Sequence, residues 1–415
     1  MPWIDALFTA TSAVCVTGLV VVDTGSYFTF FGQIVILILI QIGGLGVMTI
    51  SVALFRWIGR SVSFRHRMVM QDLFTHTPRE DIFGLVKSIV LFTISAEMIG
   101  AVSLTIHWNR QLPLELAAYT AVFHSISAFC NAGFALFSDS MVRYSDSVLL
   151  NTTICCLIVV GGIGFPVLYD VQSWIAGNKG KRVRLSIQTK SVLITTLVLI
   201  ISGTLMFAFL ERQALVEAQT LSHRILASLF QSITCRTAGF NTMDIGSLKE
   251  ATLALMIFLM FVGASPGSCG GGVKTTTLAL LVALIMSRLR NNRRVNMFKK
   301  SIPRETVTRS VSLVLVSMGI IGMFLFLILV GDCASGHGVA GQHRIFLAYL
   351  FEMVSAFGTV GLSMGVTPEL NTWGKSLVMI MMMIGRVGVL TFAYIIVGDG
   401  TTNGVEYSEE NLMLG

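Results

Sequence analysis

Four short stretches of the sequence share one pattern, a phenylalanine followed nine or ten residues later by a glycine. The two residues before each glycine are small or β-branched or carry an amide, and none is a carboxylate. The stretches are Cys15-Val16-Thr17-Gly18, Cys130-Asn131-Ala132-Gly133, Arg236-Thr237-Ala238-Gly239 and Gly358-Thr359-Val360-Gly361. One copy is a common loop sequence, whereas four copies in register indicate a shared role.

These stretches suit the binding of a dehydrated cation by backbone carbonyl groups. Each helix C-terminus carries about half a negative charge, so four short helices that point at one axis would attract a cation. The extended residues after them would replace the ion's water shell with carbonyl oxygens, as in a potassium-channel filter. Glycine at the turn reaches positive φ without a Cβ penalty. Because the stretches lack carboxylates, we expect a monovalent ion rather than a divalent one.

The composition places these elements in a membrane. Of 415 residues, 54% are hydrophobic and 12% are charged, whereas soluble proteins carry about 25% charged residues. Apolar runs predict seven helical spans, at 31–57, 83–107, 148–170, 188–210, 250–287, 310–330 and 373–397. Shorter, half-polar segments near 4–15, 115–129, 221–235 and 343–357 cannot cross, and are either external amphipathic loops or re-entrant helices.

Basic residues indicate the orientation. Three connections, within 56–87, 179–190 and 288–309, hold 19 of the 29 Lys and Arg residues, which places them in the cytoplasm. The net charge of +7 therefore needs no nucleic-acid partner, because anionic lipids of the inner leaflet account for it. The seven cysteines show neither a disulfide framework nor a metal-site spacing.

A second glycine cluster follows each of the four stretches. The clusters lie at 43–46, 161–164, 263–267 and 385–388. We therefore predict an all-α polytopic membrane protein with four span–pore-helix–span repeats in a pseudo-fourfold arrangement around one central pore. The repeats are expected at 1–58, where the first span is absent, 83–176, 188–290 and 307–398, followed by a cytoplasmic tail at 399–415.

The sequence resembles the Trk/Ktr/HKT superfamily of potassium transporters, in particular membrane subunits of the KtrB/TrkH type. The resemblance covers nearly the whole chain and is carried by the stretches around Gly18, Gly133, Gly239 and Gly361, and by Gln41-Ile42-Gly43-Gly44. It implies potassium as the permeant ion, a homodimer in the membrane and a cytosolic ring of nucleotide-binding KtrA/TrkA-type subunits. In related plant carriers a serine at the first filter position accompanies sodium transport, so Gly18 points to potassium.

One feature departs from the family pattern. The family's first repeat opens with a spanning helix, whereas this sequence starts just before the first short helix. We expect that one N-terminal span is missing from the sequence, and a genuine seven-span protein is the alternative. No cleavable targeting segment is expected at Met1.

The second span of the third repeat is interrupted by residues that cannot continue a helix without cost. The interruption spans 263–274 and includes Gly263, Ser265, Pro266, Gly267, Gly270, Gly271, Gly272 and Lys274. The resemblance matches it to the family's intramembrane gating loop, which lies under the filter.

Two basic residues are placed inside predicted spans and away from both membrane faces, where a charge is costly. Arg386 is expected to act as a cationic barrier or to anchor the gating loop, and a purely structural role is the alternative. Lys274 is a gating candidate that could instead snorkel to the cytoplasmic face. The resemblance places Arg386 opposite the gating loop and gives Arg236 a structural role behind the pore.

Three aspartates follow the filter glycines by five or six residues. Asp23, Asp139 and Asp244 are expected at the outer mouth, where they would concentrate cations. Helix N-capping is an equally good interpretation of all three.

The sequence thus predicts gated potassium uptake across a bacterial cytoplasmic membrane, with no enzymatic activity and no cofactor. Sodium is a candidate activator. A sodium-coupled or sodium-permeable transporter of the same superfamily is the alternative. A membrane enzyme is disfavoured, because no cluster of intramembrane His, Asp or Glu is present.

Overall fold

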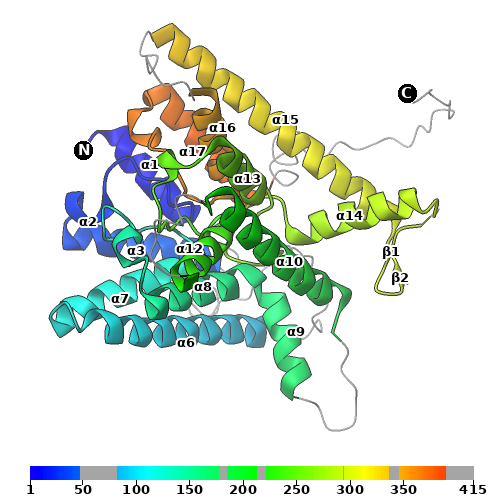
Figure 1. Cartoon of the computed structure of the whole chain (residues 1–415), viewed down its shortest axis with the longest axis horizontal. Helices are drawn as coiled ribbons and strands as arrows, with labels where there is room; N and C mark the ends of the chain where they lie inside the picture. Colours follow the sequence, from blue (N-terminus) through cyan, green and yellow to red (C-terminus); the bar gives the residue numbers. More distant parts are fainter. Residues whose placement is uncertain (47–81, 177–184, 213–220, 293, 336–344, 389–415) are drawn as a thin grey trace.

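The computed structural model describes residues 1–46, 82–176, 185–212, 221–292, 294–335 and 345–388 (Figure 1). These residues are almost entirely helical. The helices in the predicted apolar runs are α3 (Phe30–Leu45), α6 (Ile82–Trp108), α8 (Val148–Ile163), α9 (Phe165–Ala176), α10 (Ile187–Leu210), α13 (Glu250–Phe261), α14 (Thr275–Leu289), α15 (Arg304–Ser335) and α17 (Thr372–Val387). A two-stranded antiparallel hairpin, β1 (Asn296–Met297) and β2 (Lys300–Ser301), connects α14 to α15.

Four further helices occupy the half-polar segments, and we call them the short helices. They are α1 (Trp3–Val14), α7 (Leu114–Phe129), α12 (Leu221–Thr234) and α16 (Ile345–Gly358). Each carries the phenylalanine of the repeated pattern, and the four rings of Phe8, Phe123, Phe230 and Phe351 are all fully buried. These segments are therefore packed helices whose apolar anchor lies inside the protein.

The short helices pack against the longer ones in a closed order. Each short helix contacts helices of its own predicted repeat, and it also contacts one helix of the preceding repeat. In this way α7 contacts α3, α12 contacts α8, and α16 contacts α13. The first short helix, α1, contacts α17 at the other end of the described chain. An ion pair of 2.7 Å between Asp5 and Lys375 reinforces this last contact.

Polar caps and glycines define three corresponding helices. The helices α3, α8 and α17 begin after Thr29, Ser147 and Asn371, whose side chains each accept a hydrogen bond from a backbone N–H of the first turn. They end at Gly46, Gly164 and Gly388, where φ is +82°, +96° and +95°. Because β-carbons disfavour such angles, glycine sets the helix end in each case.

The expectation of one uninterrupted span over 148–170 is corrected by the structure. The chain bends by 97° between Val148–Ile163 and Phe165–Ile175. Gly164 lies at the bend, and a Cβ there would be 2.5 Å from the carbonyl oxygen of Pro266. The bend therefore follows from the need to pass close to the 263–274 loop.

The described residues contain three helices that are long and apolar enough to cross a membrane: Lys87–Trp108, Ile187–Leu210 and Arg304–Asp332. The bent pair would add a fourth. The sequence predicted seven spans; the 250–287 run is divided into α13 and α14, each too short alone. The ends of the 31–57 and 373–397 runs lie outside the described residues, as does the tail at 399–415.

Candidate functional site

The four short helices end in the same backbone turn. We use the name filter glycines for Gly18, Gly133, Gly239 and Gly361, which the sequence predicts at a filter. In the residue two before each of them, φ is positive: +56° at Val16, +57° at Asn131, +77° at Thr237 and +50° at Thr359. The residue after it donates its backbone N–H to a carbonyl group in the last turn of the short helix. Thr17 donates to the Ser12 carbonyl at 2.8 Å, and Val360 donates to the Ser355 carbonyl at 2.9 Å. Strained left-handed residues at four corresponding places indicate that the turn serves a function.

A hydroxyl side chain supports each turn. Gly18 donates its N–H to Ser12 Oγ and Gly361 donates to Ser355 Oγ, both at 3.1 Å. In the other two segments the hydroxyl donates to a carbonyl beyond the glycine, from Ser127 to Phe134 at 2.8 Å and from Thr234 to Phe240 at 2.5 Å. The sequence reasoning missed these residues, although each lies four positions after the repeated phenylalanine.

The four filter glycines lie next to one another in a closed ring. A Cβ added to any of them would meet the carbonyl oxygen of the residue that precedes the next glycine. The four contacts are Gly18 to Ala132 (2.4 Å), Gly133 to Ala238 (2.9 Å), Gly239 to Val360 (2.5 Å) and Gly361 to Thr17 (2.2 Å). We call these four glycines and four carbonyl groups the glycine ring.

The remaining residues of the four stretches surround the ring. A Cβ on Gly358 would lie 2.6 Å from the Met260 carbonyl oxygen, so this position has no room for a side chain. Arg236 is buried and its guanidinium donates to Thr196 Oγ1 of α10 at 3.4 Å. The amide of Asn131 lies 3.1 Å from the Thr237 hydroxyl. Cys15 and Cys130 are buried free thiols.

A cavity of about 330 Å³ opens on one side of the glycine ring. All four filter glycines line it, together with Asp23 and Asp244. Each of these aspartates also caps one turn of helix: Asp23 caps α2 (Thr24–Tyr27) and accepts from Ser26 N at 2.8 Å, and Asp244 caps the 3-10 turn Ile245–Ser247 and accepts from Gly246 N at 3.2 Å. The two interpretations of these residues, acidic lining and helix cap, are thus compatible.

Asp139 is not among the described residues that line this cavity. Its carboxylate pairs with Arg143 at 2.9 Å, and both side chains remain partly exposed. Partial burial raises the pKa of Asp139, but the hydrogen bond and the charge of Arg143 outweigh it and hold the pKa below its usual value. Its charge is therefore largely neutralised by its neighbour.

The 263–274 segment lies next to the ring and contacts residues of the second, third and fourth repeated segments. Ser265 N donates to the Gly162 carbonyl at 3.1 Å, and Gly271 N donates to Thr359 Oγ1 at 2.8 Å. A Cβ on Gly270 would lie 2.3 Å from Thr237 Oγ1. The glycines are needed here because the loop lies directly against filter side chains.

Further hydrogen bonds shape the loop itself. Ala264 N donates to the Gly271 carbonyl at 3.3 Å, and the Ser265 and Thr275 hydroxyls bond at 2.9 Å. Gly267 accepts from Phe165 N at 3.0 Å, just after the bend at Gly164. Backbone hydrogen bonds of the loop are thus made both within the loop and with its neighbours.

Arg386 links the loop to the first segment. Its guanidinium donates to the carbonyl of Cys269 in the loop and to that of Gly43 in α3. Lys274 instead donates to the Gly270 carbonyl within the loop, at 2.8 Å. The Arg386 and Lys274 side chains are thus both hydrogen-bonded to backbone carbonyl oxygens.

Buried carboxylates, among them Glu352 and Glu97, escaped the sequence reasoning. Glu352 of α16 is 1% exposed and accepts hydrogen bonds from the hydroxyls of Ser363 and Thr367, at 2.9 Å for the latter. Glu97 of α6 accepts from the Gln41 amide at 3.3 Å. The only sequence signal for Glu352 was its position directly after Phe351 of the repeated pattern. Among the described residues, no group of three or more His, Cys, Asp or Glu could hold a metal ion.

Comparison with known proteins gives a consistent result. Residues 1–397 match the family described as TrkH, cation transport protein. The Ktr system potassium uptake protein B of Vibrio alginolyticus is 41% identical over 99% of this chain and 88% of its own length. The potassium/sodium uptake protein NtpJ of Enterococcus hirae is 35% identical over 100% of this chain and 90% of its own length. The crystal structure of the potassium transporter TrkH from Vibrio parahaemolyticus superposes with a TM-score of 0.69 at 19% identity, over 95% of this chain and 78% of the other.

Proposed function

The chain belongs to the TrkH family of cation transport proteins, and from this premise we propose that it takes up potassium across a bacterial cytoplasmic membrane. The family consists of ion transporters, so the expectation that the chain is not an enzyme is confirmed. Uptake would be passive, because a membrane potential supplies about 2.3 kcal/mol per charge per 100 mV. Related proteins named for potassium uptake support this ion.

The pore would lie on the axis of the glycine ring. Four repeats, at 1–58, 83–176, 188–290 and 307–398, would surround it, each contributing one short helix. The observation that carries the proposal is the closed order of glycine-to-carbonyl contacts, in which the fourth segment returns to the first. The matching closed order of helix contacts supports it.

The ring would act as the selectivity filter. The short helices end beside it, so their partial negative charges favour a cation. Backbone N–H groups bond back to the helices, which leaves carbonyl oxygens as the groups available for coordination. The four positive φ angles would hold this conformation in each repeat, and Asp23 and Asp244 would concentrate cations in the outer cavity.

The 263–274 loop would be the gate. It lies against Thr237 and Thr359 of the proposed filter, and its backbone is irregular between α13 and α14, so it can rearrange without unwinding a helix. Arg386 would fasten the closed loop to α3, and its positive charge would oppose cation passage.

Partners complete the proposal. We expect a homodimer in the membrane, a cytosolic ring of nucleotide-binding subunits that acts on the gate, and anionic lipids at the basic cytoplasmic loops. Sodium would be an activator rather than the main substrate. The name of the Enterococcus relative makes sodium permeation the alternative to test.

Rubidium uptake tests the function. A bacterial strain that lacks its own potassium uptake systems would express the chain, and rubidium-86 influx would be measured with potassium or sodium as competitor. We expect potassium to compete at much lower concentration than sodium. Equal competition would favour the sodium-permeable alternative, and influx no greater than in the empty strain, with the chain present in the membrane, would contradict transport.

A further inference from the structure

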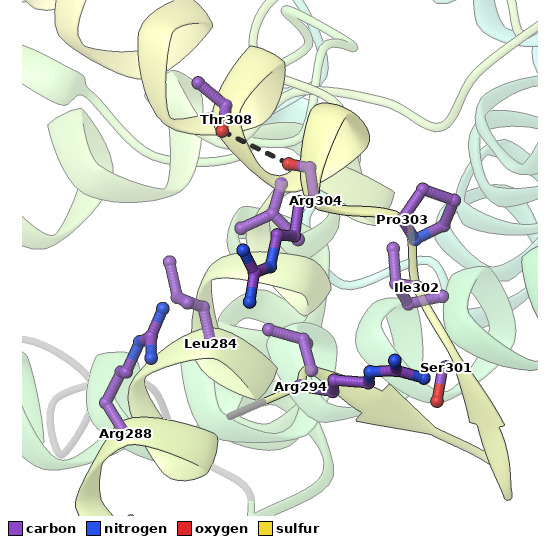
Figure 2. A pocket seen from close by; sticks show the side chains of 10 residues that line it. Leu284, Arg288, Arg294, Ser301, Ile302, Pro303, Arg304 and Thr308 are labelled. Atoms are coloured by element: carbon purple, nitrogen blue, oxygen red, sulfur yellow. Dashed lines mark hydrogen bonds between the residues drawn. The ribbon is translucent and has the colours of Figure 1, made fainter. Parts of the chain in front are cut away.

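A second hollow lies where α14 ends and α15 begins (Figure 2). Its volume is about 670 Å³. Leu284 and Arg288 of α14, Arg294 and Ser301 of the hairpin region, and Arg304 at the start of α15 contribute to its lining. Residues from three separate elements therefore converge on one space, which we call the arginine cavity.

The arginine cavity is positively charged. Arg288, Arg294 and Arg304 line it, no acidic residue does, and none of the three forms an ion pair with another described residue. In Figure 2 the Arg304 side chain extends into the space above Leu284, and Arg288 approaches it from α14. Guanidinium groups bind phosphate oxygens in a bidentate manner, so a phosphate is the ligand that fits this lining.

The frame that carries the arginines is fixed by hydrogen bonds. Ser287 Oγ of α14 donates to the Arg294 carbonyl at 2.9 Å, and Ile302 N donates to the Val295 carbonyl at 2.9 Å. These bonds attach the hairpin to the end of α14 and bring its second strand beside the first. The spacing of the three arginine backbones is therefore set before a ligand arrives.

Apolar side chains on α14 and α15, the two helices that contribute to the arginine cavity, are exposed. Ile285 and Leu289 on α14 are 57% and 77% exposed, and Leu315 on α15 is 64% exposed. Part of the lining of the arginine cavity is also apolar, since it includes Leu284, Ile302 and Val307. A ligand with a phosphate at one end and hydrocarbon at the other matches both features, whereas a free anion matches only the first.

We propose that the arginine cavity binds the phosphate of an anionic phospholipid of the inner leaflet, with its acyl chains along the exposed apolar faces of α14 and α15. The inference rests on the proposed orientation, which places the 288–309 connection in the cytoplasm. Phosphatidylglycerol is the probe, because its headgroup presents a phosphate and a net negative charge.

Native mass spectrometry of the purified chain in detergent tests this site. Phosphatidylglycerol or phosphatidylcholine would be added to the parent chain and to a triple variant, Arg288→Gln with Arg294→Gln and Arg304→Gln. The matched control removes three exposed basic side chains nearby that do not line the arginine cavity, as Arg290→Gln with Lys299→Gln and Lys300→Gln. We expect phosphatidylglycerol binding to weaken at least about tenfold in the triple variant only.

Other results would overturn the proposal. These are unchanged phosphatidylglycerol binding in the triple variant, an equal loss in the control, equally tight phosphatidylcholine binding, or displacement of the lipid by millimolar inorganic phosphate. An Arg→Lys triple variant keeps the charge and should retain part of the binding, which separates lost recognition from misfolding. Rubidium flux is measured separately, so a failure of transport does not affect the lipid result.

Discussion

Replacing Gly361 with alanine would test the glycine ring most directly. The new Cβ would lie 2.2 Å from the Thr17 carbonyl oxygen and 2.9 Å from the Gly18 Cα. Non-bonded carbon atoms in van der Waals contact are about 3.5–4.0 Å apart, so the ring residues of one repeat must move by about 1 Å. Functional sites tolerate about 0.5 Å, so coordination by the Thr17 carbonyl should be lost.

Gly365 provides a matched control for backbone strain. Its φ is +90° against +89° at Gly361, but a Cβ there would meet nothing within 4 Å. Alanine at either position costs about 1–2 kcal/mol of left-handed strain. Only Gly361→Ala adds the collision with the neighbouring segment, so any difference between the two variants reports on the ring.

The assay is rubidium flux into liposomes that contain each purified variant, with potassium and sodium as competitors. We expect the potassium-to-sodium preference of Gly361→Ala to fall at least about tenfold, equivalent to about 1.4 kcal/mol. Gly365→Ala should keep the preference of the parent chain. A folded Gly361→Ala protein with unchanged preference, or an equal loss in both variants, would refute the assignment of the filter.

Three further predictions concern the surroundings of the ring. Arg386→Gln should raise basal flux, because it releases the 263–274 loop from α3; lower flux in a folded protein would contradict the gate. Glu352→Gln should lower the free energy of unfolding by about 1–3 kcal/mol, measured by thermal unfolding, because one carboxylate oxygen that accepts a buried hydroxyl becomes a donor. The double variant Asp23→Asn with Asp244→Asn should slow uptake at low ionic strength and less at high salt, since exposed charges are screened. Asp139→Asn should have a smaller effect on the same uptake rates, and an equal effect would contradict the proposed role of the cavity aspartates.

Local sequence was sufficient to predict the short helices and their ends. Phe8 and its three counterparts recur at a fixed distance before a glycine, and this pattern depends on residue types within about 10 positions of each other. The ends of α3 and α17 at Gly46 and Gly388 were not predicted, because the apolar runs continue to 57 and 397, although glycine reaches the φ angles found there without strain. The family was also predicted correctly from these motifs.

Long-range contacts could not be predicted in the same way. Arg386 bonds to carbonyls 117 and 343 residues away, and nothing in Gly385-Arg386-Val387-Gly388 specifies either partner. Asp23 and Asp139 follow their glycines at similar distances, yet only the first lines the cavity, whereas the second pairs with Arg143.

The sequence by itself thus determined where the four short helices lie and that a glycine turn follows each of them, since these features depend on φ and ψ preferences within a few residues. Only the tertiary structure decided which carbonyl faces which glycine, where the 263–274 loop lies and which carboxylates become buried. Those outcomes depend on how helices distant in sequence pack against one another, and close packing transmits the position of each element to all its neighbours.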